Sequence, residues 1–342
     1  MKYLIDSEVK EEIYEILELE NIYKDYSTII ICCPVGLLND SDEATKYKLV
    51  QYQLGKFRFI NKLKQLAFLI YSIVKYRPDI VFSGYPMLKH RLVNIFSAFR
   101  IKHYSYLRGL FADSKNYKGF SDYLYLMLKK YHLPLTINNF QCDKIFTISA
   151  LNIKFLLARS AKQENIELIP PPWLEKIKKQ KTLSGSDAIS GGHVYFVTQA
   201  FMSHSCKAAA ESQIVFATEL HEHLKQNGVE LIIRKHPRDY TDYEKYGFSI
   251  NNISSYEFIR TLCPNDILIT PFSTMAFEAR FFDVNIIFYS TSDLDELYKK
   301  VYSDLNITPF YNVAEIGSEI RDFYGKSKPL KNVENIFHIN SE

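Results

Sequence analysis

The sequence has few cysteines, a single tryptophan and no long apolar run. Its five cysteines are an odd number without CxxC spacing, so neither a disulfide framework nor a zinc site is predicted. No apolar stretch reaches the roughly 18 residues that a membrane-spanning helix needs. The first residues also lack the basic start, apolar middle and small-residue cleavage site of a secretory signal. We therefore expect a cytoplasmic protein.

The sequence also lacks a large excess of positive or negative charge. The 42 Lys and Arg residues nearly balance the 39 Asp and Glu residues, and they are spread along the chain. Nucleic-acid-binding domains usually gather basic residues on one face, so nucleic acid is not expected as a partner. At 342 residues the chain is long enough for two domains that each bury a core.

Short apolar runs alternate with helix-period stretches, which is typical of parallel α/β domains. In the first half the predicted strands are Ser27–Pro34, Asp79–Ser83, Tyr104–Leu107 and Lys144–Ser149, and the predicted helices are Lys56–Lys75, His90–Phe99, Asp122–Tyr131 and Leu151–Ala161. In the second half the predicted strands are His193–Thr198, Val229–Lys235, Asp266–Thr270 and Asn285–Tyr289, and the predicted helices are Ala208–Gln226, Tyr256–Leu262 and one that starts near Thr274.

A charged and then Ser- and Gly-rich segment without periodicity separates the two halves, and it predicts a linker over residues 174–191. The expected domains are therefore residues 1–173 and residues 192–342. It stays open whether the last helices pack back on the first domain. Ligands of open parallel sheets bind at the carboxyl ends of the strands, so the residues that follow each strand are the candidates for chemistry.

A histidine-proline pair follows one of these strands. Strand Val229–Lys235 leads into His236 and Pro237, and the proline stiffens the turn that presents the imidazole. Lys235 and Arg238 add positive charge, which suits an anion. The alternative is a surface turn with a solvated basic cluster.

Two hydroxyl residues follow the next strand. Ser273 and Thr274 stand where a buried strand gives way to a helix, and the free N–H groups of such a helix start attract phosphate. Glu278 lies one helical turn further on and could accept hydrogen bonds from a ribose. The alternatives are an ordinary helix cap and an exposed helix charge. Thr198 and Gln199, with the polar residues 203–205, could form the other wall of the site or could cap the next helix.

The HP pair followed by a Ser-Thr pair, within Val229–Ala279, resembles bacterial sialyltransferases of the polysialyltransferase and lipooligosaccharide sialyltransferase groups; related Kdo and other sugar transferases use similar loops. The resemblance implies an α/β GT-B fold, with two Rossmann-like doubly wound domains that face a central cleft. It also implies a CMP-activated donor bound mainly by residues 192–342, an acceptor bound by residues 1–173, and inversion at the anomeric carbon without a metal or another cofactor.

Carried over to this chain, the resemblance gives His236 the role of stabilising the departing CMP phosphate. Ser273 and Thr274 would bind the same phosphate. The remaining residues expected around the nucleotide are Thr198, Gln199, Lys235, Pro237 and Glu278.

The candidates for the catalytic base come from the first domain. The family has an acidic D/E-D/E-G motif in its first domain, whereas this chain reads Tyr106-Leu107-Arg108-Gly109 at the corresponding place. Asp113 and Asp122 are the nearest carboxylates and become the candidates. Arg108, together with Gly36 and Tyr85 at other strand ends, could contact the acceptor or an acidic sugar.

Two further motifs need an interpretation. Asp40-Ser41-Asp42 has the DxD spacing of metal-dependent transferases, but a solvated acidic loop is the favoured reading, and no metal site is expected. Segment Lys56–Arg77 has an apolar stripe, which we expect to pack against the first sheet. A membrane-surface contact of the same segment, which would suit a lipid-linked acceptor, remains the alternative.

The sequence thus predicts an enzyme that transfers sialic acid, or a related nonulosonic acid, from a CMP donor to a cell-surface glycan such as lipopolysaccharide O-antigen, lipooligosaccharide or capsule. Its expected place is the cytoplasm, with peripheral contact to the inner membrane left open. The alternatives are a GT-B transferase that uses CMP-Kdo or a UDP- or GDP-sugar, a nucleotide-sugar epimerase, and a glycan-assembly scaffold without activity.

Overall fold

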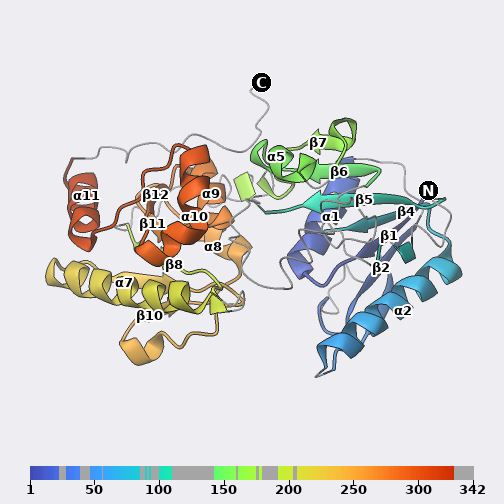
Figure 1. Ribbon diagram of the computed structural model, residues 1–342, viewed down its shortest axis with the longest axis horizontal. Helices are drawn as coiled ribbons and strands as arrows, with labels where there is room; N and C mark the ends of the chain where they lie inside the picture. The colour runs from blue at the N-terminus through green and yellow to red at the C-terminus, as the bar shows by residue number, and fades with distance from the viewer. Residues whose placement is uncertain are drawn as a thin grey trace. The chain divides into compact units, whose positions relative to one another are not determined.

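The computed structural model describes residues 1–22, 28–38, 47–55, 57–84, 89–90, 92–93, 100–109, 142–158, 161–174, 177–178, 192–202 and 206–326. These residues form two compact units, one up to residue 174 and one from residue 177 onward. Each unit is built around its own parallel sheet (Figure 1). The expected α/β class with two Rossmann-like domains is confirmed.

The first domain has seven parallel strands in the order β3-β2-β1-β4-β5-β6-β7. Its strands are β1 (Lys2–Asp6), β2 (Thr28–Pro34), β3 (Lys48–Tyr52), β4 (Ile80–Ser83), β5 (Lys102–Leu107), β6 (Lys144–Thr147) and β7 (Ile166–Leu168). Its helices are α1 (Lys10–Ile22), α2 (Arg58–Tyr76), α5 (Leu151–Leu157) and the 3-10 helix η2 (Gln163–Asn165). The strand order reverses between β1 and β4, where doubly wound sheets bind their ligands.

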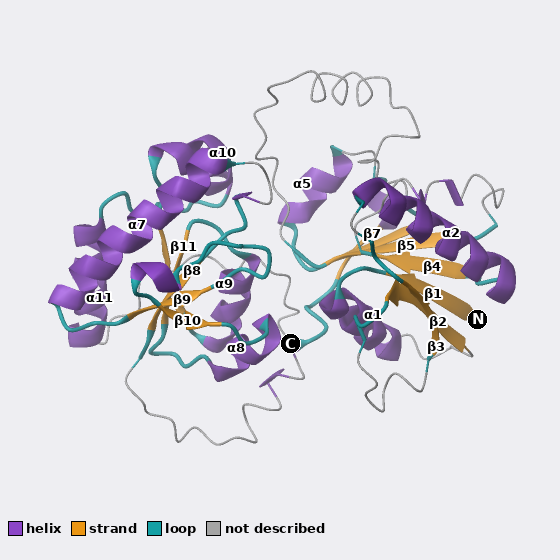
Figure 2. Cartoon of the chain, turned by 90° about the horizontal axis from the view of Figure 1, so that it is seen from below, coloured by secondary structure: helices purple, strands orange, loops and turns teal. Residues whose placement is uncertain are grey.

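Helices α1 and α2 cover opposite faces of this sheet (Figure 2). Leu69 of α2 is fully buried against Leu4, Ile30 and Val81. The interpretation that the whole apolar stripe of Lys56–Arg77 packs on the sheet is wrong. Part of the stripe lies on the side of the helix that faces the sheet, and part lies on the outer side. The exposed members on the outer side are Ile60, Leu63, Ile70 and Val74.

The second domain has five parallel strands in the order β10-β9-β8-β11-β12. Its strands are β8 (Val194–Val197), β9 (Leu231–Arg234), β10 (Ser249–Asn251), β11 (Ile267–Thr270) and β12 (Asn285–Phe288). Its helices are α7 (Lys207–Gln226), α8 (Ser255–Thr261), α9 (Thr274–Ala279), α10 (Ser292–Asp304) and α11 (Val313–Lys326), with the 3-10 helices η4 (Glu244–Tyr246) and η5 (Arg280–Phe282). Here the order reverses between β8 and β11.

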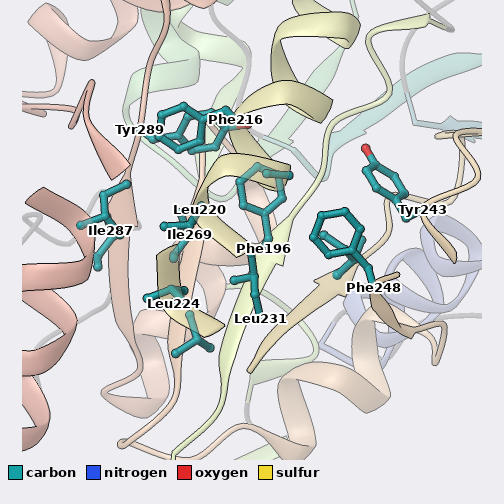
Figure 3. Packing of buried hydrophobic residues seen from close by; sticks show 14 of the residues in the cluster. Phe196, Phe216, Leu220, Leu224, Leu231, Tyr243, Phe248, Ile269, Ile287 and Tyr289 are labelled. Atoms are coloured by element: carbon teal, nitrogen blue, oxygen red, sulfur yellow. The ribbon is translucent and has the colours of Figure 1, made fainter. Parts of the chain in front are cut away.

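The core of the second domain lies between the sheet and α7. Phe216 of α7 stacks on Tyr289, with ring centroids 4.3 Å apart, and Leu220 and Leu224 continue the contact along the helix (Figure 3). Helix α11 packs on α7 within this domain. The residues after 326 lie outside the described part of the chain, so packing of the chain end on the first domain remains a prediction. The continuous apolar strands, such as VYFV and ILIT, are buried on both faces, as parallel sheets require.

Candidate functional site

The predicted donor residues gather at the carboxyl edge of the second sheet. Strands β9, β8 and β11 are neighbours in that order and run parallel, so the residues that follow them share one edge. Thr198 follows β8, His236 follows β9, and Ser273 follows β11. This edge includes the point of order reversal between β8 and β11, where a Rossmann-like sheet receives its nucleotide.

The turn at His236 is fixed by hydrogen bonds from both sides. The backbone N–H of His236 donates to Oγ1 of the buried Thr198 at 3.0 Å, and the N–H of Thr198 donates to the carbonyl of Arg234 at 3.1 Å. The N–H of Arg238 donates to Nδ1 of the imidazole at 3.1 Å. Because Nδ1 accepts, a neutral ring carries its proton on Nε2. The ring therefore presents an N–H donor, which is what a phosphate oxygen binds.

A buried polar chain joins the turn at His236 to the segment after β8. Gln213 of α7 accepts from the N–H of Gln199 at 2.8 Å and donates to the hydroxyl of Tyr243 at 3.0 Å. That hydroxyl donates to Asp239 at 3.0 Å, and the N–H of Asp239 donates to the carbonyl of His236 at 2.9 Å. The segment after β8 and the turn at His236 are thus held together by the side chains of Gln213, Tyr243 and Asp239.

The hydroxyl residues after β11 are placed differently from ordinary caps. Ser273 occupies the N-cap position of α9, and its carbonyl accepts from the N–H of Ala276 at 3.1 Å, as at an ordinary helix start, but its side chain makes no capping hydrogen bond. Thr274 is the first residue of the helix. Glu278 is only 3% exposed, so the alternative of an exposed helix charge is wrong. The convergence of these hydroxyls and the imidazole of His236 on one anion remains a prediction.

The basic residues around the HP pair have separate roles. Arg234 is buried, donates to the carbonyls of Lys235 at 3.1 Å and Asn251 at 3.2 Å, and lies over the ring of Phe258. Burial lowers the pKa of its guanidinium. Arg234 therefore supports the turn from inside, whereas Lys235 is half-buried and Pro237 and Arg238 are exposed.

A second polar cluster, which the sequence did not predict, lies at the carboxyl edge of the first sheet. Asp6 ends β1 beside Ser83 of β4, at the order reversal of this sheet. Its buried carboxylate accepts from Lys89 Nζ at 2.6 Å and from His90 Nε2 at 2.7 Å. Burial works against the ionised form, but the Lys89 ammonium and the hydrogen bond from His90 outweigh it and lower the pKa of Asp6 to about 2.

Two glutamates of α1 extend this cluster. The buried carboxylate of Glu15 accepts from the hydroxyl of Tyr106 at 2.7 Å and from Nε of Arg108 at 2.6 Å. Burial is the main cause that raises the pKa of Glu15. Arg108, which was expected to contact the acceptor or an acidic sugar, is thus paired with a carboxylate of its own domain. Part of its side chain remains exposed.

Glu12 is the more accessible of the two glutamates. Its Oε2 accepts from the hydroxyl of Ser7 at 2.6 Å, and its Oε1 makes no hydrogen bond within the described part of the chain. Burial is again the main cause that raises its pKa. The carboxylate lies against Gly84 so closely that a Cβ at residue 84 would collide with it. Gly84 therefore makes room for Glu12 at the end of β4.

The structure describes only some of the remaining predicted residues. Asp113, Asp122, Tyr85, the DxD sequence at residues 40–42 and residues 203–205 lie outside the described residues. Gly36 is described and has a φ of 80° in the turn after β2, a conformation that favours glycine. Across the described ranges, no three His, Cys, Asp or Glu side chains are grouped so that they could hold a metal ion. No helix in those ranges is long and apolar enough to cross a membrane.

Comparisons with known proteins come from structure alone, since no family model and no curated protein sequence matches the chain. UDP-GlcNAc 2-epimerase from Neisseria meningitidis, solved with UDP-GlcNAc bound, is 12% identical with a TM-score of 0.62 over 99% of this chain and 96% of that one. UDP-GlcNAc 2-epimerase from Methanocaldococcus jannaschii is 14% identical, with a TM-score of 0.59 over 98% and 96%. A glycosyltransferase from Rickettsia africae is 14% identical, with a TM-score of 0.54 over 96% and 89%. The chain therefore shares the two-domain Rossmann-like fold of these proteins.

Proposed function

We propose that the protein is a glycosyltransferase that binds a nucleotide-sugar donor at the carboxyl edge of its second sheet. The observation that carries this proposal is the turn at His236, which lies where Rossmann-like sheets bind nucleotides. Hydrogen bonds from Thr198 and from the chain Gln213–Tyr243–Asp239 hold this turn in place. Support comes from the fold, which the chain shares with enzymes named for UDP-GlcNAc and with glycosyltransferases.

The donor we propose is the CMP derivative of sialic acid or a related nonulosonic acid, and the acceptor is a hydroxyl of a cell-surface glycan. CMP leaves with one phosphate, so its charge can be met by neutral and cationic hydrogen-bond donors without a metal ion. His236 would donate from Nε2, and Ser273 and Thr274 would donate from their hydroxyls. Hydrogen bonds to an ionised group contribute about 1.5–3 kcal/mol each.

The reaction also needs a group that accepts the acceptor's proton. We assign this role to Glu12, because its raised pKa and its Oε1, which makes no hydrogen bond within the described residues, suit a general base better than the fully engaged Glu15. The acceptor oxygen would bond to the anomeric carbon as its proton passes to Glu12, while the bond from that carbon to the CMP phosphate breaks. Asp113 and Asp122 remain the alternative bases. Glu12→Gln should lower kcat by about 10²–10⁴ and leave CMP binding unchanged.

The first test is a thermal-shift comparison of CMP, UDP and GDP. The proposal predicts that CMP raises the melting temperature most. Stabilisation by UDP or GDP alone would replace the proposed donor by a UDP- or GDP-sugar. A CMP response calls for a second comparison, between CMP-nonulosonic acid and CMP-Kdo as donors, with transfer followed by mass spectrometry of the glycan product.

The role of His236 has its own test. His236→Ala should lower kcat by about 10²–10³, the loss seen when a donor to a developing anion is removed. His193→Ala is the matched control, because this exposed histidine lies at the amino end of the same sheet. Activity of His236→Ala within about threefold of the wild type would reject the role in stabilising the leaving group.

A nucleotide-sugar epimerase is the second candidate, favoured by the likeness to the two UDP-GlcNAc 2-epimerases. Product analysis with donor alone separates the two, since an epimerase converts its substrate without an acceptor. A protein that binds CMP tightly and turns over no donor would instead be a scaffold.

A further inference from the structure

Helix α2 has an apolar side that the first domain does not use. Its inner side packs on the sheet through the buried Leu69 and through Phe68 and Ile73. At 100° per residue, positions 60, 63, 67, 70, 71 and 74 fall on one outer arc of the helix. The large side chains on that arc are exposed: Ile60 46%, Leu63 51%, Ile70 41%, Tyr71 49% and Val74 70%.

The apolar arc continues beyond the start of the helix. Phe57 is 71% exposed and Leu54 is 49% exposed, in the segment that leads from β3 into α2. Exposed apolar residues scattered singly are normal, but a contiguous row along a helix of 19 residues is not. Such a row indicates a surface that is covered by something else when the protein works.

The charges on α2 indicate what covers it. The helix contains no Asp and no Glu, whereas Lys64 and Lys75 border the apolar arc on one side and Arg77 caps the carboxyl end of the helix. Nζ of Lys75 is 2.8 Å from the hydroxyl of Tyr71, so an aromatic residue and a cation stand together at the margin. Apolar arcs flanked by Lys, Arg and Tyr are typical of helices that lie in the plane of a membrane surface.

We propose that the outer side of α2 docks on a membrane with anionic lipid headgroups. The apolar arc would lie at the boundary between headgroups and acyl chains, and the flanking cations would contact the anionic headgroups. A second copy of this chain fits less well, because two such helices would bring cations against cations with no carboxylate between them. The proposal is independent of which donor the second domain binds.

Vesicle sedimentation of the full-length protein tests the proposal. Phosphatidylcholine vesicles are compared with vesicles that also contain phosphatidylglycerol, at low and high salt. We expect binding to the anionic vesicles, weakened by salt, and little binding to neutral ones. Equal binding to both kinds of vesicle, or binding to neither, would overturn it. Light scattering that shows a dimer in the wild type and a monomer in Leu63→Gln/Val74→Gln would assign the surface to a second copy instead.

Three variants locate the contact. Leu63→Gln/Val74→Gln should abolish sedimentation with anionic vesicles, and Lys64→Gln/Lys75→Gln should weaken it by roughly fivefold per cation removed. Val215→Gln is the control, because Val215 is equally exposed, at 55%, on α7 of the second domain. Circular dichroism and melting temperature should be unchanged in all three, since the substituted side chains are exposed or lie at the rim of the helix. Loss of binding in Val215→Gln, or full binding in Leu63→Gln/Val74→Gln, would refute the assignment to α2.

Discussion

At the scale of single residues, Thr198 links two strands of the second sheet through one hydroxyl. Thr198→Val keeps the shape of the side chain but leaves the N–H of His236 without its acceptor. Loss of the partner of such a group costs about 1–3 kcal/mol. Urea unfolding should therefore show a lower free energy of unfolding for Thr198→Val. Thr218→Val on α7 is the control, where the lost hydroxyl bonds only a carbonyl of its own helix, and an equal loss in both variants would contradict the prediction.

Asp6 predicts a pH dependence of stability. Its pKa is about 2 in the folded protein and about 3.9 in an unfolded chain, so it stabilises the fold above pH 4 and loses that effect as the pH falls toward 2. Glu12 and Glu15 have raised pKa values and act in the opposite direction. The quantity to measure is therefore the difference in the free energy of unfolding between the wild type and Asp6→Asn. Urea unfolding gives this difference from pH 6 down to the lowest pH at which the protein stays folded.

We expect this difference to shrink steadily below about pH 4, because the wild type loses the ion pair with Lys89 as Asp6 takes up a proton. Asp79→Asn is a control, since this exposed carboxylate also lies beside β1. A difference that stays constant with pH would show that Asp6 is not ionised in the folded protein.

At the scale of elements, the buried chain from Gln213 to Asp239 couples α7 to the turn at His236. Tyr243→Phe removes its central hydroxyl and leaves Gln213 and Asp239 without their shared partner. We expect the affinity for CMP to fall by about tenfold, since the two segments would no longer be held in one arrangement. Isothermal titration calorimetry measures the affinity, and Tyr246→Phe, at an exposed ring nearby, is the control. Unchanged affinity in Tyr243→Phe would separate this chain from the nucleotide site.

The sequence predicted most of the strands and the long helices α2 and α7, but it missed the helices α1, α10 and α11 and the strand β1, which lies inside the first sheet. Strands such as β4, β8 and β11 are uninterrupted apolar runs, and α7 has a clear helical period, so their residues alone identify them. In contrast, β1 has five residues and runs almost directly into the acidic helix α1, so the segment as a whole looks amphipathic. Its place inside the sheet follows from pairing with β2 and β4, and such tertiary contacts cannot be seen in the local sequence.

The candidate sites likewise differ in whether local sequence identifies them or only tertiary pairing does. The donor edge could be predicted because His236 and Ser273 directly follow recognisable strands. The cluster around Asp6 could not, because its members come from segments that are distant in sequence and meet only once β1 lies beside β4. The signal that was present is the short run KYLID, in which an acid and then Ser7 end an apolar stretch.

At the scale of the whole molecule, two domains with separate cores should respond separately to a nucleotide. Saturating CMP stabilises the unit that binds it, by about 2.7 kcal/mol at a concentration one hundred times Kd. Hydrogen exchange followed by mass spectrometry should therefore show slower exchange in peptides that cover β8, β9 and β11. Peptides of β2 and β6 in the first sheet serve as internal controls. Protection confined to the first sheet would move the nucleotide site to the other domain.

The position of β1 also matters while the protein is being made. Residues 2–6 leave the ribosome long before β4, which begins at Ile80, yet they lie inside the seven-stranded sheet and bond to that strand. Strand β1 therefore has one uncovered edge until β4 has been synthesised. An affinity tag fused directly to Met1 would adjoin the amino end of this interior strand, so a flexible spacer is needed there.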